Sequence, residues 1–320
     1  MATAIVDPTA PSGGRPGGGV YRFLRSIPTW VLWLLVMVWS VPTFGLLVNS
    51  FRTRDDQRAA GWWNVFTGNW GDGFTLDNYQ QVLSASGQTD IKSGLANSLA
   101  IALPATIIPI AFAAFAAYAF AWMDFKGREP LFIGTVALLA IPTQLALIPL
   151  LQMYVGGAHL TIPWLDKTIT LVPDLDLAGT TTAVWLTHTA FGMPFAIFLL
   201  HNYMSSLPKD LFEAAKIDGA SHFKIFYKLV LPLSVPVLAA FAIFQFLWTW
   251  NDYLIALVMV GPNPNALPAT VKLASQAGEF GRLEHLLTAG AFLQAAVPLA
   301  VFFLLQRFFV RGILAGSVKG

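Results

Sequence analysis

Long, uninterrupted apolar runs constrain this chain more than any other feature. A helix needs about 20 mostly apolar residues to cross a bilayer, and six stretches qualify, at 29–49, 94–122, 131–155, 180–203, 231–261 and 285–309. Charged residues make up only 11% of the chain, against about 25% in soluble domains. The runs do not alternate apolar and polar residues as transmembrane β-strands do. The sequence therefore predicts an all-α, polytopic membrane protein with six transmembrane helices, and it excludes an ordinary soluble enzyme.

Basic residues are divided unequally between the two sets of connecting segments. The N-terminal tail, 123–130, 204–228 and the C-terminal end together hold 12 Lys and Arg, whereas 50–93, 156–179 and 262–284 hold 7. Cytoplasmic connections carry the excess of Lys and Arg, so both termini are expected in the cytoplasm. The predicted organisation is a disordered basic N-tail at 1–28, a membrane domain at 29–309 with its core at 94–309, and a C-tail at 310–320.

Several kinds of active site have no counterpart in the sequence. Cysteine is absent, which excludes thiolate metal ligands and cysteine nucleophiles. There is no Gly-x-x-x-x-Gly-Lys-Ser/Thr phosphate loop, no Gly-x-Ser-x-Gly elbow, and no metal-ligand spacing among the five histidines. The net charge of +2 is too small to indicate nucleic acid. We therefore expect no catalytic residue, metal site or cofactor in this chain.

The longest predicted cytoplasmic connection, residues 205–230, has the pattern of two short helices. Ser206 is a candidate N-cap for the first, and Gly219 ends it because glycine readily takes the left-handed conformation. Ser221 is a candidate N-cap for the second. The apolar face of the first helix comprises Leu211, Phe212, Ala215 and Ile217. The pattern alone leaves open an ordinary amphipathic connection that rests on lipid headgroups.

A longer motif in this connection resembles a known family. Glu213-Ala-Ala-x-x-x-Gly219, nine residues, then Leu229-x-Leu231-Pro232 is similar to the EAA loop of bacterial ABC importer permeases. That family has Ile where this chain has Leu229, which keeps the bulk. The segment 248–254, Trp-Thr-Trp-Asn-Asp-Tyr-Leu, resembles the fifth span of MalG-like sugar-importing permeases. The resemblance extends from about residue 90 to the C-terminus.

The resemblance implies the type I ABC importer permease fold, in a bacterial plasma membrane. It implies that 205–230 couples the membrane domain to a separate ATPase, through Glu213, Ala214, Ala215, Asp218, Gly219, Phe223 and Pro232. The implied partners are two ATP-binding subunits, a second homologous permease, an extracytoplasmic solute-binding protein and the lipid bilayer. The implied cargo is a sugar, such as an α-glucoside or oligosaccharide. The alternatives are a polyol or glycerol phosphate as cargo, or an ATPase-independent carrier or membrane-embedded enzyme.

The fifth span carries the candidate substrate pathway. At 31 residues it would be about 46 Å long as one helix, longer than the roughly 30 Å hydrocarbon core. We therefore expect it to tilt strongly, to protrude or to break, with 249–252 as the favoured position of a break. Candidate pathway residues are Gln245, Trp248, Asn251 and Asp252. Their amide, indole and carboxylate groups suit a sugar, whose hydroxyls need hydrogen-bond partners. The alternative is that Trp248 and Trp250 form an interfacial belt and Asp252 has a packing role, which we favour for Asp252.

Two further segments are expected to contact partners. The extracytoplasmic segment 156–179 is a candidate for contact with the binding protein because of its predicted side of the membrane. By resemblance, the C-tail from Arg311 to Gly320 is a candidate contact for an ATPase subunit.

Overall fold

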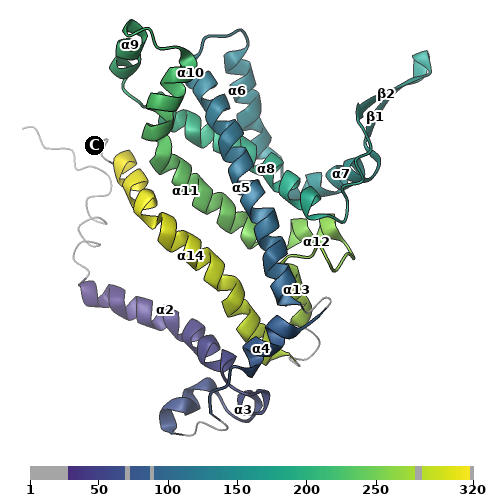
Figure 1. The fold of residues 1–320 in the computed structure, drawn as a ribbon, viewed down its shortest axis with the longest axis vertical. Coiled ribbons are helices and arrows are strands. Elements are labelled where there is room, and N and C mark those ends of the chain that lie inside the picture. The colour runs from purple at the N-terminus through teal and green to yellow at the C-terminus, as the bar shows by residue number, and fades with distance from the viewer. Residues whose placement is uncertain (1–27, 69–72, 87–89, 278–282, 318–320) are drawn as a thin grey trace, which may run out of the picture.

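The computed structural model describes residues 28–68, 73–86, 90–277 and 283–317. The predicted N-tail, residues 1–28, lies outside these ranges except for Pro28. Figure 1 shows long helices that run obliquely across the molecule, from an end that carries α9 (Lys209–Ile217) to an opposite side that carries α12 (Leu254–Val260), α13 (Ala269–Gln276) and α4 (Asp77–Ser84).

Five helices of the described residues are long and apolar enough to cross a membrane, and a bent pair makes a sixth candidate span. The five are α2 (Thr29–Ser50), α5 (Ile91–Trp122), α8 (Thr181–Ser205), the continuous helix His222–Trp250 and α14 (Glu284–Ser317), whose span is Glu284–Gln306. The bent pair joins Arg128–Ala140 to Thr143–Gly156 at 102°. The prediction of a polytopic helical membrane protein is confirmed.

The bend in the third candidate span follows from one proline. Helix α6 (Arg128–Ala137) continues into a 3₁₀ turn, η3 (Leu138–Ala140), and α7 (Thr143–Gly156) begins after Pro142. Ile141, which precedes this proline, is extended at φ −79° and ψ 120°, because a residue before proline is disfavoured in the helical region. The sequence predicts a single span at 131–155, and the structure divides it at Pro142.

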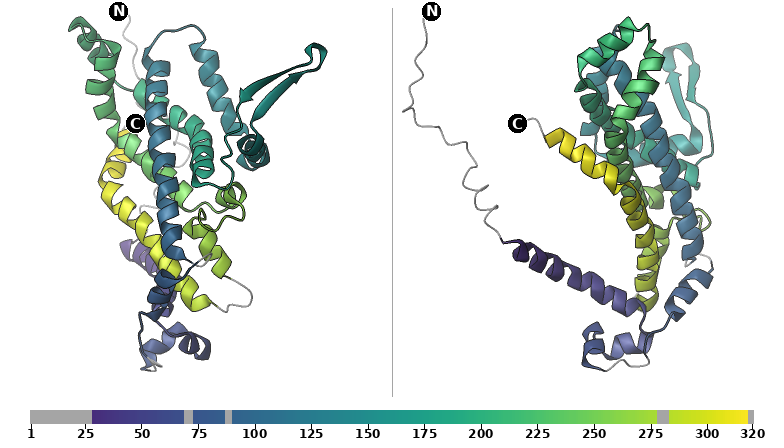
Figure 2. Two further views of the ribbon diagram at one scale, coloured as in Figure 1. Left: turned by 45° about the vertical axis from the view of Figure 1, so that its right-hand side comes forward. Right: turned by 60° about the vertical axis from the view of Figure 1, so that its left-hand side comes forward.

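The centre of the molecule is the pair α5 and α8, which pack along each other and share a buried cluster with the 205–230 connection. Helix α5 contributes small buried side chains, including Ala113, Ala114 and Ala117. Small residues let helix backbones approach closely, which drives helix association in membranes where lipid is as apolar as leucine. Figure 2 shows α2 diverging from this bundle, and its side chains are largely exposed, with Trp39 at 86%.

The fifth span does not begin at residue 231 as expected. Helix α10 (His222–Ile225), a π-helical turn η5 (Phe226–Val230) and α11 (Leu231–Trp250) form one continuous helix. Pro232 has no N–H to donate to the carbonyl four residues earlier, and π turns are a common adjustment to such a loss. The predicted break is confirmed, because α11 ends at Trp250 and α12 starts at Leu254.

The remaining elements lie between the spans. A short α3 (Arg54–Ala59), a 3₁₀ turn η1 (Trp62–Thr67) and α4 join α2 to α5. An antiparallel hairpin, β1 (Ala158–Ile162) and β2 (Lys167–Val172), joined by the 3₁₀ turn η4 (Pro163–Leu165), follows α7. The sequence did not predict these strands. Helix α14 runs to Ser317, so the predicted C-tail at 310–320 is helical as far as that residue.

Candidate functional site

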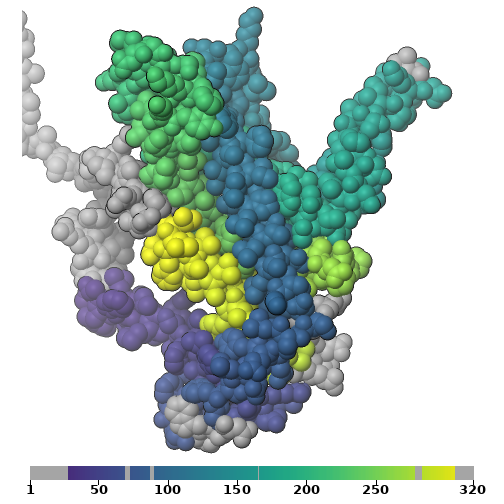
Figure 3. Space-filling view, in the orientation of Figure 1, coloured from purple at the N-terminus to yellow at the C-terminus, as the bar shows by residue number. Residues whose placement is uncertain are grey.

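The 205–230 connection, called the coupling loop from here on, projects at one end of the molecule. Figure 3 shows it in green at the upper left of the molecule, apart from the hairpin, which is teal and at the upper right. The two segments are attached to different ends of α8, since the hairpin precedes its first residue and α9 follows its last. A loop in this place is accessible to a second protein.

Helix α9 begins differently from the prediction. Its N-cap is Pro208, with no side-chain hydrogen bond. Ser206 is instead the C-cap of α8, and its hydroxyl donates to the carbonyl oxygen of Tyr203 at 2.8 Å. The prediction of Ser206 as an N-cap is therefore wrong. Pro208 is nevertheless a suitable first residue, because the N–H it lacks would have no helical partner there. Asp210 lies in the first turn, near the positive end of the helix dipole.

The end of α9 matches the prediction. Gly219 has φ +71°, the left-handed conformation that glycine adopts without steric cost. The N–H of Gly219 donates to Lys216 and the N–H of Ala220 to Ala215, each at 3.0 Å. These two bonds are the pair of a Schellman cap. Ser221 then caps α10, its hydroxyl accepting from the N–H of Lys224 at 3.4 Å, as predicted.

The coupling residues that the resemblance implies are mostly accessible. Glu213, Ala214, Asp218, Gly219, Phe223 and Pro232 are exposed, and Ala215 is half-buried. The predicted apolar face of α9 divides in two. Phe212 is buried, whereas Ile217 is 87% exposed and Leu211 is also exposed. The outer face of α9 therefore combines a carboxylate with bare apolar side chains.

Gln245, the first candidate pathway residue, is fully buried. Its Nε2 donates to the carbonyl oxygen of Ala105 on α5 at 3.2 Å and to that of His188 on α8 at 3.3 Å. A Cβ atom on Gly192 would lie 2.6 Å from the Gln245 Oε1, so this amide fits only beside a glycine. In this structure the Gln245 amide joins three helices.

Trp248, by contrast, is half-buried and borders a cavity of about 210 Å³ between α8 and α11. The cavity is lined by Leu139, Phe191, Gly192, Phe195, Phe244, Gln245 and Trp248. Four of these side chains are aromatic, and Phe195 and Phe244 have ring centroids 5.5 Å apart. Such a lining offers flat apolar faces beside one amide, the combination that small-ligand pockets use.

Asn251 and Asp252 lie at the break between α11 and α12. Asn251 is exposed, and its Nδ2 donates to the carbonyl oxygen of Leu247 in its own helix. Asp252 Oδ2 accepts from the N–H of Ala256 at 3.0 Å and lies 3.5 Å from His188 Nε2. The Asp252 carboxylate therefore accepts a backbone hydrogen bond from the first turn of α12 and lies near His188 of α8. Trp250 is 1% exposed and donates to Gln294 at 3.2 Å, so it does not belong to an exposed interfacial belt.

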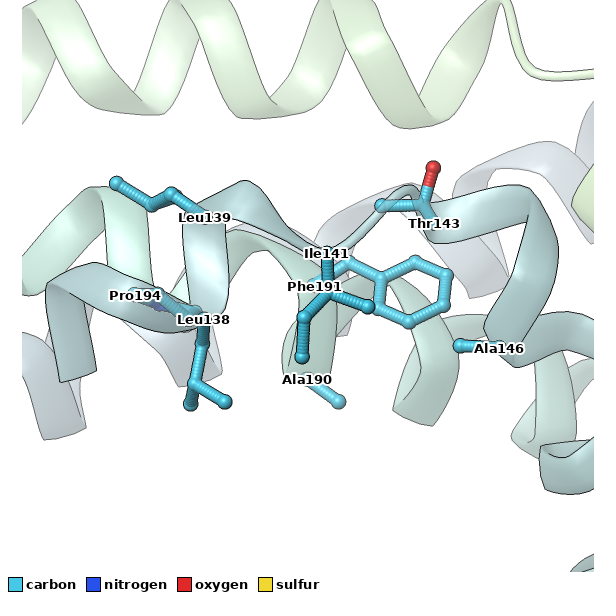
Figure 4. A pocket seen from close by; sticks show the side chains of 8 residues that line it. All are labelled: Leu138, Leu139, Ile141, Thr143, Ala146, Ala190, Phe191 and Pro194. Carbon is cyan, nitrogen blue, oxygen red and sulfur yellow. The ribbon is translucent and has the colours of Figure 1, made fainter. Parts of the chain in front are cut away.

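A second cavity lies at the bend of the third span. Figure 4 shows the residues that line this pocket, of about 220 Å³, among them Leu138, Leu139 and Ile141 of the bent span and Phe191 of α8. Its lining is almost wholly apolar, with Thr143 as the polar exception. It shares Leu139 and Phe191 with the Trp248 cavity. The two cavities therefore adjoin each other along α8. The sequence did not indicate this arrangement, because it depends on the 102° bend. In the described part of the chain, no three His, Asp or Glu side chains are grouped as metal ligands.

Comparison with known proteins agrees with this arrangement. The family described as "Binding-protein-dependent transport system inner membrane component" matches residues 109–315. The chain is 50% identical over 303 residues to the osmoprotective compounds uptake permease protein GgtD of Synechocystis sp., covering 93% of this chain and 94% of that protein. It is 50% identical over 275 residues to the alpha-glucoside transport system permease protein AglG of Rhizobium meliloti, covering 85% and 68%.

Solved structures share the fold. A chain of a bacterial alginate ABC transporter, crystallised with an alginate pentasaccharide-bound periplasmic protein, superposes with a TM-score of 0.63 at 13% identity, covering 93% of this chain and 98% of that one. The chain therefore belongs to the inner membrane components of binding-protein-dependent transport systems, and it is a permease subunit of an ABC importer.

Proposed function

We propose that this permease carries an α-glucoside or a related oligosaccharide. The observation that carries the proposal is the aromatic cavity beside Trp248, because aromatic faces pack on pyranose rings. The 50% identity to an alpha-glucoside permease supports it. The equal identity to an osmoprotective compounds uptake permease favours a second candidate, an osmoprotective compound such as a polyol.

The coupling loop contacts an ATP-hydrolysing subunit in this proposal. Glu213 makes the polar contact, and Ala214, Ala215, Asp218, Gly219 and Phe223 form the surrounding surface. Support comes from the exposure of α9 at one end of the molecule and from its rigid Schellman-capped form. Two such subunits and a second, homologous permease complete the importer. ATP hydrolysis belongs to those subunits, and this chain contributes no catalytic residue.

The coupling loop and both termini are cytoplasmic in the same proposal, with residues 29–309 as the membrane domain and 310–320 at its cytoplasmic end. Support comes from the excess of Lys and Arg on that side. The hairpin then lies on the extracytoplasmic side and contacts the solute-binding protein. Its Trp164 is 84% exposed, and tryptophan is enriched in protein interfaces.

The cargo is tested on the cognate binding protein, which selects the solute. Thermal-shift measurements with α-glucosides, other oligosaccharides, polyols and glycerol phosphate should show stabilisation by an α-glucoside. Uptake assays with the same solutes then check that Trp248→Ala lowers transport while the permease still assembles with its ATPase. Stabilisation by a polyol alone would assign the second candidate, and stabilisation by a non-carbohydrate alone would overturn both.

A further inference from the structure

The buried side of the coupling loop is fixed to the end of α5. Phe212 of α9 is 3% exposed, and its ring stacks on Trp122, the last residue of α5, with centroids 3.5 Å apart and an interplanar angle of 14°. The Trp122 indole Nε1 donates to the carbonyl oxygen of Met204, in the last turn of α8, at 3.0 Å. The indole ring is therefore held in one orientation between α8 and α9.

A second contact lies one helical turn earlier on α5. The Tyr118 hydroxyl and His222 Nδ1 of α10 are 3.0 Å apart and share a hydrogen bond. Phe226 packs against Tyr118 with ring centroids 5.3 Å apart and stacks on Phe115 at 4.7 Å. Tyr118 and Trp122 are four residues apart, so they lie on one face of α5. That single face contacts both short helices of the coupling loop.

The covalent route from α9 into the membrane is less direct. Helix α9 reaches the continuous helix His222–Trp250 only through the turn at Gly219, Ala220 and Ser221. The turn is held by the two backbone hydrogen bonds of its Schellman cap, but no side chain packs around Gly219. The aromatic contacts to α5 add a second constraint on the position of α9.

We propose that Trp122 and Tyr118 are positioning residues that fasten the coupling loop to α5, so that movement of the ATPase subunits enters the membrane domain through α5 as well as through α11. The inference rests on the proposed role of the coupling loop. Helix α5 packs along α8 and against α11 and α13, so a displacement of its end reaches the core of the permease.

The test uses the complete importer, with its ATPase subunits, partner permease and binding protein, in proteoliposomes. Trp122→Ala removes both the stack and the indole donor, and Trp122→Phe keeps an aromatic ring. Phe112→Ala is the matched control, because Phe112 lies on α5 but is 64% exposed. The readouts are co-purification of the ATPase, basal ATPase activity, its stimulation by liganded binding protein, and solute uptake.

We expect Trp122→Ala to keep basal ATPase activity but to lose roughly tenfold in stimulation and uptake, the rate equivalent of about one aromatic pair and one hydrogen bond. Trp122→Phe should recover most of that loss, and Phe112→Ala should match the wild type. Normal stimulation and uptake in Trp122→Ala would overturn the proposal. If Trp122→Ala fails to assemble, Tyr118→Phe serves as the test, because it removes only the hydroxyl bonded to His222. Unchanged stimulation in Tyr118→Phe would then contradict the proposal.

A cross-link tests whether the contact between Trp122 and Phe212 transmits movement or only stabilises the fold. The chain has no cysteine, so Trp122→Cys with Phe212→Cys provides a unique pair for a short bifunctional thiol reagent. Cross-linking should restore stimulation that the reduced pair has lost, and failure to restore it would contradict fastening. Failure of the coupling role itself would look different, because Glu213→Ala would then leave ATPase co-purification and stimulation unaffected.

Discussion

At the scale of single residues, polar side chains inside the spans join helices to one another. Gln245 bonds backbone carbonyls on α5 and α8, and Asp252 caps α12 while approaching His188. Amide and carboxylate groups in an apolar surrounding need such partners, because an unpaired polar group is costly to bury. Among the candidate pathway residues, Trp248 and Asn251 therefore retain accessible surface, whereas Gln245 does not.

Gly192→Ala is expected to destabilise the permease by about 1–3 kcal/mol, because the new Cβ displaces the Gln245 amide from its two acceptors. Thermal unfolding in detergent measures the change. Gly134→Ala is the control, since no atom lies within 4 Å of a Cβ at that helical position, and it should be neutral or slightly stabilising. Equal stability of Gly192→Ala and wild type would contradict this account of Gln245.

A buried lysine on α13 and the nearby Asp90 give a second prediction, which concerns the pH dependence of stability. Lys272 is 1% exposed, and its Nζ donates to Ser93 Oγ at 2.6 Å. Burial lowers the pKa of Lys272, and the charge of Asp90 opposes that change. Asp90 caps α5, and the backbone N–H of Ser93 is the main group holding the pKa of its carboxyl below 3.8. Asp90 therefore contributes stability above pH 3.8, and this contribution is lost as pH falls through the lowered pKa.

Asp90→Asn isolates that contribution. Asparagine caps a helix about as well as aspartate, so the variant loses the charge and keeps the cap. It should unfold at a lower temperature than wild type at pH 7, and the gap should close as the pH falls below 3.8. The measurement is thermal unfolding in detergent across this pH range. A gap that stays constant with pH would show that the Asp90 charge does not stabilise the fold.

At the scale of elements, the important feature is that α10, η5 and α11 form one helix. The π turn at Phe226–Val230 sets the rotation of α10 relative to α11, and with it the direction of Phe226 toward Phe115 and Tyr118. Pro232 accounts for the turn, because its missing N–H prevents a regular bond to the carbonyl of Lys228. The motif proline thus shapes the helix rather than ending it.

Pro232→Ala is expected to let the π turn relax to a regular helix and rotate α10 away from its contacts on α5. Uptake and ATPase stimulation should fall several-fold while the protein stays folded, since alanine suits a helix better than proline by about 3 kcal/mol. Pro236→Ala, inside α11, is the matched control and should have the smaller effect. Transport assays on both variants check this, and equal effects would count against a special role for Pro232.

Some parts of the fold can be predicted from the sequence and others cannot. Apolar length identifies the spans. Local chemistry predicts the end of α9 at Gly219, the cap at Ser221 and the break after Trp250. The Phe212–Trp122 stack was missed, because it joins residues far apart in sequence. Inside a membrane both the lipid-facing and the packed side of a helix are apolar, so periodicity does not mark the buried face. The bend follows from Pro142, but neither its angle nor the hairpin is indicated by apolar length.

At the scale of the whole molecule, a packed pair of helices joins the two segments that we propose to contact partner proteins. The hairpin precedes the start of α8 and the coupling loop follows its end, and α5 and α8 share the central buried cluster. Apolar surface on α2 and on the outer faces of other spans stays exposed in the single chain. Lipid covers such faces in a membrane, together with the second permease that we propose.

The most direct measurement is solute-stimulated ATP hydrolysis and uptake by the complete importer carrying Gly219→Pro. Proline is locked near φ −65° and does not reach the +71° of Gly219, whereas Gly219→Asn tolerates that conformation. The account predicts that Gly219→Pro abolishes stimulation and uptake, that Gly219→Asn retains both, and that wild-type uptake requires the ATPase subunits. Uptake that survives Gly219→Pro, or that proceeds without those subunits, would contradict it.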